Sequence, residues 1–316
     1  MKFKKKLFIN LFLLVLTNTI YSQDNNKKLF YTDAFFVTSN ENNFEYIKEI
    51  EGYETNKETY PVKIYYKSGK IFLTGNTLDK DRVLLHGKCL YFYENGKKKR
   101  IANYENNKLI DKQFYYYENG LFKLESEIEV SKNKKEYSIK IHNFFDENND
   151  QKVTNGEGEF VDQESDNETS FGVIKNFVKE GIWKGRIIDE KVEFTEQYNK
   201  GKLTSGNSID SLNNKYSYNL IRETASPKKG MNNFYSYVKN CGVIPKNIDG
   251  YVTGKILVIF DVNEKGALEN VSAYSQDQFG VTENALKLIS KYENWIPGKY
   301  RGMLVKTHFT LPITFQ

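Results

Sequence analysis

Apolar and polar positions alternate most regularly near the C-terminal end of the chain. Residues Val305–Phe315 alternate with period two, which predicts a strand with one buried face. Pro312 has no N–H for a ladder, so this strand is expected at a sheet edge. Two more strands are predicted over Gly254–Val262 and Ala267–Tyr274, joined by a tight turn.

Helical periodicity appears on both sides of these strands. Apolar residues at helical spacing predict a short helix over residues 231–238 and a longer amphipathic helix over Val281–Tyr292, with Thr282 as its N-cap. Pro and Gly within Ser226–Gly230 mark a boundary before the first helix. We therefore expect a small two-layer α+β domain over residues 226–316.

The middle of the chain repeats an aromatic strand, a tight turn and another aromatic strand. Tyr91–Gly96 recurs as Tyr115–Gly120, and weaker copies occur at Tyr65–Gly69 and Tyr198–Gly201. Asn-Gly between such strands predicts hairpins with type I′ turns. The spacing predicts an antiparallel β-meander or solenoid of about 16 strands over residues 23–225.

Composition agrees with a mainly β chain, because 23 Tyr and 22 Phe favour pleated surfaces. The fold class expected for the whole chain is α+β: a meander of hairpin repeats followed by the small C-terminal domain. The two cysteines lie in different parts of the chain, so a disulfide framework is not expected.

The N-terminus has the layout of a secretory signal peptide. Four lysines within Lys2–Lys6 precede an apolar run over Leu7–Leu16, and a small residue, Ser22, stands before Gln23. The run is shorter than the about 20 apolar residues of a membrane span. We expect cleavage after residue 22 and a periplasmic location; an uncleaved anchor is the alternative.

Net charge argues against nucleic acid as a partner. The formal net charge of the whole chain is +5, and residues 1–22 hold four lysines and no acid, which leaves +1 after cleavage. The remaining lysines are mixed with acids along the chain. The concentrated basic surface of a nucleic-acid binder is therefore not expected.

Two resemblances follow from these motifs. The tyrosine phrases, with Gly181–Gly185 and Phe194–Leu203, resemble variant MORN repeats of bacterial exported proteins. The C-terminal part resembles the TonB C-terminal domain family in the order and spacing of a longer set of residues. That set is Gly254, Lys255, Val258, Phe260, Val262, Gly266, Val271, Ala285, Trp295–Gly298, Gly302 and Leu311–Phe315.

The TonB resemblance implies a non-enzymatic domain that adds a segment of a partner to an exposed sheet edge. The implied partner is an outer-membrane transporter or another envelope protein, with membrane contact only through that partner. Neither a cofactor nor a metal is implied. The residues expected at the partner edge are Lys306, Thr307, His308, Thr310, Trp295, Pro297 and Gly298.

Two family features are absent, which leaves other functions open. TonB proteins of transport carry a membrane helix with a His and a long Pro-rich spacer. Here no His precedes His86, and the chain has five Pro. The alternatives are an exported scaffold whose repeats bind peptide or glycan without energy transduction, and a secreted hydrolase.

Motifs for other chemistry are incomplete. Asp146 to Glu157 follows a calcium-loop template, but Gln151 stands where the loop requires Gly. His86 and Cys89 have a metal-like spacing without a second pair of ligands. No catalytic residue is therefore assigned.

Mass spectrometry of the protein from an envelope fraction should find Gln23 as the first residue. The physical reason is the short apolar run, which can enter the export machinery but cannot span a bilayer. An intact Met1 in the inner membrane would instead identify a membrane anchor.

Overall fold

The computed structural model describes residues 27–315, except 34–35, 37–38, 40–41, 131–136, 245–252, 274–279 and 293–294. The predicted signal peptide, residues 1–22, lies outside the described residues. The chain divides into two compact units. The first holds residues up to Asp111 with Tyr115–Gly120, and the second holds Lys112–Phe114 with residues from Leu121 onward.

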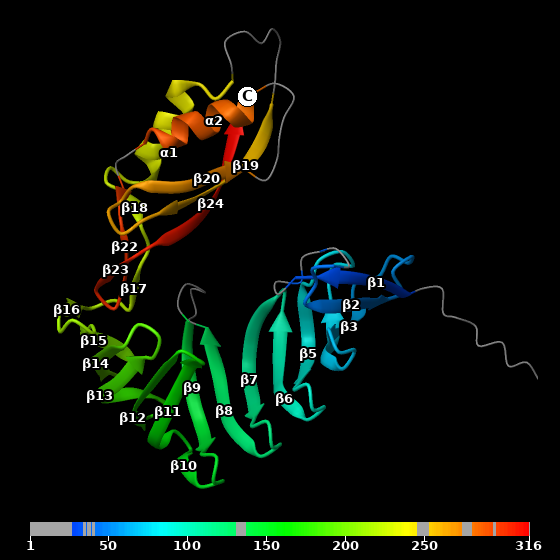
Figure 1. Ribbon diagram of the computed structural model, residues 1–316. Coiled ribbons are helices and arrows are strands. Elements are labelled where there is room, and N and C mark those ends of the chain that lie inside the picture. The colour runs from blue at the N-terminus through cyan, green and yellow to red at the C-terminus, as the bar shows by residue number, and fades with distance from the viewer. Residues whose placement is uncertain are drawn as a thin grey trace, which may run out of the picture. The chain divides into compact units, whose positions relative to one another are not determined.

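Sixteen antiparallel strands follow one another in chain order in one sheet (Figure 1). This confirms the predicted meander and its number of strands. The strands are β1 (Lys27–Thr32), β2 (Tyr46–Glu51), β3 (Tyr60–Tyr66), β4 (Ile71–Thr77), β5 (Leu85–Phe92), β6 (Lys98–Glu105), β7 (Lys108–Tyr116), β8 (Phe122–Val130), β9 (Tyr137–Phe145), β10 (Gln151–Thr154), β11 (Glu157–Ser165), β12 (Glu168–Lys175), β13 (Val178–Ile187), β14 (Val192–Asn199), β15 (Lys202–Ile209) and β16 (Lys215–Tyr218).

The Asn-Gly turns of the two tyrosine phrases, Tyr91–Gly96 and Tyr115–Gly120, differ from the predicted type. In the turn after β5, the Gly96 N–H donates to the Tyr93 carbonyl (2.9 Å), and of residues 94–96 only Gly96 has a positive φ, 83°. This is a type I turn followed by a left-handed glycine, so the prediction of type I′ is wrong here. The Asn95 side chain accepts the Lys97 N–H and donates to the Glu118 carbonyl, which links two successive turns.

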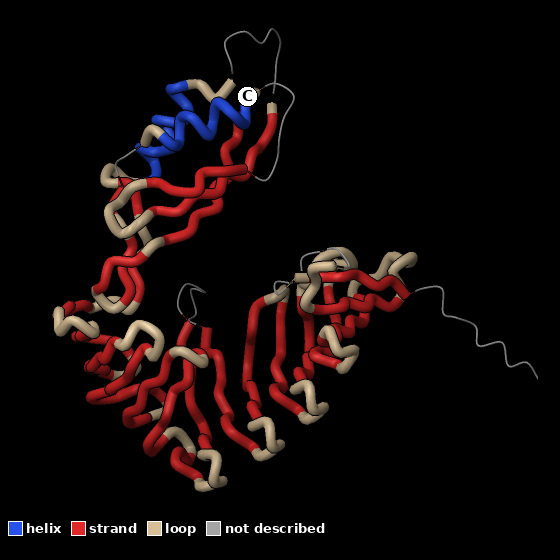
Figure 2. Tube along the Cα trace, in the orientation of Figure 1, coloured by secondary structure: helices blue, strands red, loops and turns tan. Residues whose placement is uncertain are grey.

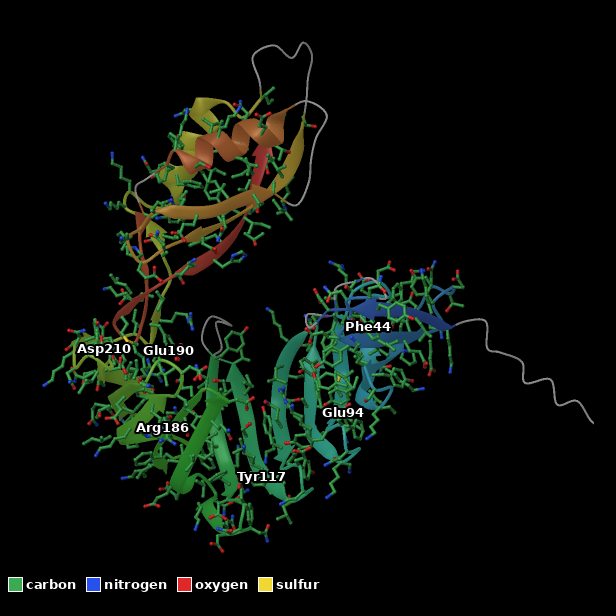
Figure 3. The ribbon with its side chains drawn as sticks, viewed as in Figure 1. Phe44, Glu94, Tyr117, Arg186, Glu190 and Asp210 are labelled. Carbon is green, nitrogen blue, oxygen red and sulfur yellow. The ribbon has the colours of Figure 1, made fainter. Side chains whose placement is uncertain are left out.

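Type I′ turns do occur, at hairpins where both central residues have positive φ. In the described part of the repeat sheet, these pairs are Asn106–Asn107, Asn155–Gly156, Asn176–Phe177 and Lys200–Gly201. Figure 3 labels one residue in each of two glycine turns of the first unit, Glu94 and Tyr117. Asn-Gly thus indicated where the hairpins turn, but not how.

Glycines in the second unit leave room for aromatic rings on the next strand. A Cβ built on Gly172 would overlap the Trp183 ring, and one on Gly206 would overlap the Tyr218 ring. Trp183 is fully buried and lies edge-on to Phe160 (ring centroids 6.3 Å apart). The glycine–aromatic spacing of the repeats is therefore a packing requirement.

After β16 the second unit continues with short strand pairs and a two-layer body. The short strands are β17 (Arg222–Glu223), β18 (Ser226–Pro227), β21 (Trp295–Ile296), β22 (Gly298–Tyr300) and β23 (Met303–Val305). The body comprises α1 (Met231–Cys241), α2 (Val281–Ser290), β19 (Gly254–Val262), β20 (Leu268–Ala273) and β24 (Thr307–Phe315). Among the described residues, these are the only helices, and neither is long and apolar enough to cross a membrane (Figure 2).

Both helices cover one face of the sheet β20-β19-β24 (Figure 1). Phe234 of α1, Ile289 of α2 and Phe260 of β19 are fully buried between the layers, as the helical spacing predicted. The predicted N-cap is wrong: α2 follows Gly280 in a left-handed conformation, and Thr282 lies inside the helix. The bend at Gly280 sets the start of the helix in place of a side-chain cap.

Gly172→Val should destabilise the second unit by about 1–3 kcal/mol, because the added methyl groups must displace the Trp183 ring. Thr195→Val, on the exposed face of β14, is the matched control and should change stability by less than about 0.5 kcal/mol. Urea denaturation of the full chain measures both. Equal midpoints for the two variants would show that the ring does not need the glycine.

Candidate functional site

Strand β24 is an edge strand with an unbroken ladder on one side. Its nine residues pair with β19 in continuous register, from Val262 opposite Thr307 to Gly254 opposite Phe315. Within the described part of the chain, β24 pairs with no other strand. The predicted edge position of this strand is confirmed, and the edge is nine residues long.

The hydrogen-bond pattern of β19 shows which backbone groups of β24 are open. The Asn263 N–H donates to the Ala267 carbonyl (2.9 Å), so Asn263 points its backbone groups toward β20. Alternate residues point to opposite sides, so Val262 and every second residue before it point toward β24. Their partners, Thr307 and the odd-numbered residues after it, bond to β19.

The even-numbered residues of β24 therefore direct their backbone groups to the open side. His308, Thr310 and Thr314 each offer an N–H and a carbonyl there, whereas Pro312 offers a carbonyl alone. Pro312 thus loses no bond to β19 and leaves a gap in the row of open donors. Thr307, expected beside the captured segment, instead bonds to β19.

The other edge of this sheet is less regular. The ladder between β19 and β20 has a register shift between Ile259 and Asp261, and Asn270 on β20 has a φ of 54°. A bulge of this kind discourages pairing with another strand. Of the two edges, β24 is the better template for an added strand.

Charged side chains beside the open edge already have partners. Lys306 pairs with Glu269 (3.1 Å), and His308 Nδ1 lies 2.9 Å from Asp261 Oδ1. Hydrogen bonds lower the pKa of Asp261, with the larger contribution from Asn270 and a smaller one from His308. The Glu269 carboxylate raises the pKa of Lys306. Lys306 and His308 therefore already have acidic partners, and the backbone groups of the even-numbered residues are the open groups of this edge.

The remaining predicted site residues support the edge from behind. Trp295 is 1% exposed and packs its ring on Phe260 and Phe309 (centroids 5.4 and 5.1 Å away), so it contacts no ligand directly. Gly298 lies against the Thr307 hydroxyl, where a Cβ would not fit. Pro297 lies beside the turn at Gly266.

A buried ion cluster that the sequence reading missed lies next to this support. Arg301, at the tip of the β22–β23 hairpin, is fully buried among residues of the repeat sheet. Its guanidinium bonds to Glu168 on β12 (2.5 Å) and to Glu196 on β14 (3.0 Å). The guanidinium also lies 3.6 Å from the centre of the Phe194 ring, and the Ser208 hydroxyl donates to the Arg301 carbonyl.

Opposite charges compensate for the burial of this arginine. Burial by itself lowers the pKa of Arg301, but Glu196, Tyr300 and Glu168 outweigh it and raise that pKa. Burial, together with the Glu196 carboxylate, raises the pKa of Tyr218, whose hydroxyl donates to Glu196 (2.8 Å). The arginine is therefore charged at any physiological pH.

The sequence held one signal for this cluster. On β14 every second residue is buried, and Glu196 stands in that row between Phe194 and Tyr198. A carboxylate in an apolar row requires a buried partner. Sequence alone could not name Arg301, because it lies 105 residues away.

The exposed face of the repeat sheet carries a shallow hollow of about 450 Å³ over β12–β15. Phe171, 56% exposed, lines it together with Lys184 and Arg186 (Arg186 is labelled in Figure 3). The calcium-like segment forms a hairpin turn: the Asp146 carboxylate accepts the Asn148 and Asp150 amides. Within the described ranges, no three metal-ligating side chains converge.

Neither the protein-family models nor the curated proteins include a match to this chain.

Arg301→Met should lower the stability of the second unit by about 3–5 kcal/mol near neutral pH, because two buried carboxylates lose their counter-charge.

Urea denaturation of the full chain near pH 7 measures this loss, and the midpoint of Arg301→Met should lie well below that of wild type. Arg222→Met removes an exposed arginine that stacks on the Tyr300 ring and serves as the control. Equal midpoints for Arg301→Met and wild type would mean that the two carboxylates do not need the arginine.

Proposed function

We propose that the chain is an exported, non-enzymatic protein of the periplasm that resembles TonB in its C-terminal domain. It captures an extended segment of an outer-membrane transporter, or of another envelope protein, by adding it to the open edge of β24. The observation that carries this proposal is the continuous nine-residue register of β24 with a free row of backbone groups on its other side.

The open groups set the scale of the affinity. His308 and Thr310 provide two donors and two acceptors in succession, and Pro312 and Thr314 add to the row of acceptors. Each backbone bond contributes about 0.5–1.5 kcal/mol net. Once the ordering of the captured segment is subtracted, an affinity in the micromolar range follows.

Side chains set a simple sequence rule for the captured segment. On the core side, Phe309 and Leu311 are partly buried and pack against the aromatic core. On the solvent side, Lys306 and His308 are already paired with acids. The favoured segment therefore carries apolar residues at every second position, facing Phe309 and Leu311, and uncharged residues between them.

A second candidate function rests on the hollow over β12–β15. There an exposed aromatic ring, Phe171, lies beside Thr169, Thr195 and Asn207, a mixture suited to stacking and hydrogen bonding with a neutral glycan. In that case the chain is an exported scaffold whose repeats bind glycan and whose last domain docks it to a partner, without energy transduction.

Thr310→Pro should weaken capture at least about tenfold, because it removes an open N–H and blocks the neighbouring bonds while leaving the ladder to β19 intact. The measurement is calorimetric titration of the full chain with 12-residue peptides from the N-terminal ends of outer-membrane transporters. Thr310→Val keeps the N–H and the side-chain size, and its affinity should equal that of wild type.

Peptides methylated on alternate backbone nitrogens provide a second control. Methylation at the positions that donate to β24 should abolish binding, and methylation at the intervening positions should not. Equal losses for Thr310→Pro and Thr310→Val, or no binding by any peptide, would rule out capture at this edge.

A further inference from the structure

The strand that forms the open edge is a direct continuation of the hairpin that carries Arg301. Strand β23 ends at Val305, and Lys306 alone separates it from β24. The hairpin tip adopts a two-residue turn in which Arg301 (φ 47°) and Gly302 (φ 81°) are both left-handed. Only five residues thus lie between the buried arginine and Thr307, the first residue of the edge strand.

A backbone hydrogen bond and apolar contacts, in addition to the ion pairs of Arg301, hold the hairpin tip in place. The Arg301 N–H donates to the Ile221 carbonyl (2.7 Å), and a Cβ on Gly302 would touch Tyr216. Tyr300 and Met303 pack against the buried Ile187, Val192 and Phe194 of β13 and β14. The hairpin therefore closes this end of the repeat core in the way that a terminal cap closes a repeat array.

We infer that Arg301 couples the β24 edge to the repeat sheet, so that docking of the hairpin and capture of a partner strand stabilise each other. The inference rests on the proposed capture at β24 and adds its regulation. Arg301 is a positioning residue: it fixes the start of β24 through the hairpin and touches no partner. Coupling between two sites is reciprocal, so a strand bound at β24 must strengthen the contacts of β12–β14 to the same degree.

The alternative to docking is costly, which makes the coupling strong. A released hairpin would expose the apolar Phe194 and Ile187 and would separate Glu168 and Glu196 from their cation. The ion pairs and the ring stacking would be lost together, because both are made by the Arg301 guanidinium. The segment is therefore expected to open and close as one cooperative step.

Hydrogen exchange of the full chain, followed by mass spectrometry, tests the coupling without a ligand. Arg301→Lys keeps the charge and the fold but loses the fork that spans the two carboxylates. Amides of β24 and of β12–β14 should both exchange at least about tenfold faster in this variant. Arg222→Lys is the matched control and should change neither set, and amides of β3–β5 in the first unit provide the internal reference.

A second arm adds the peptide that binds most tightly in the transporter set. In wild type it should slow exchange in β24 and also in β12–β14; in Arg301→Lys it should slow exchange in β24 alone. Unchanged β24 exchange in ligand-free Arg301→Lys, or a bound peptide that leaves β12–β14 unaffected in wild type, would overturn the coupling. Failure of the proposed function has a different signature, because then no peptide slows β24 in either protein.

Discussion

An arginine buried between two glutamates determines how the second unit is built. Isolated charges in a protein interior cost far more than folding can offset, so Arg301, Glu168 and Glu196 must remain together. The hairpin must then lie on the repeat sheet, and β24 must start where the hairpin leaves it. A buried ion pair contributes little to stability compared with an apolar replacement. Its effect here is to fix a single position of the β22–β23 hairpin on the repeat sheet.

The repeat sheet depends instead on steric fit between side chains of neighbouring strands. In the second unit, three aromatic rings lie over a glycine on the strand before them: Trp183 over Gly172, Phe194 over Gly185 and Tyr218 over Gly206. Short turns then fix the register between neighbours. Such a sheet needs few long-range contacts along most of its length, and the buried ion cluster is the exception at its last strands.

The sequence predicted what depends on local periodicity. The bounds of β19 agree residue for residue with the predicted strand, and the faces of both helices are correct, because burial follows the apolar spacing. Turn type was not predictable from Asn-Gly alone, since a glycine in the left-handed region suits a type I′ turn as well as a type I turn with a bulge. Pro312 was enough to predict that β24 is an edge strand. Which of its residues direct their backbone groups to the open side was decided only by the hydrogen bond of Asn263 in the structure.

The gap at Pro312 has a consequence for the time that a partner stays bound. Each backbone bond contributes about 0.5–1.5 kcal/mol net, so an edge without this gap would hold its partner up to about tenfold longer. With one donor missing from the row, the proposed complex stays in the micromolar range. At an association rate constant of about 10⁶ M⁻¹s⁻¹, a micromolar complex dissociates within about one second. The proline would therefore suit the edge to rapid exchange between many copies of a partner rather than to permanent assembly with one.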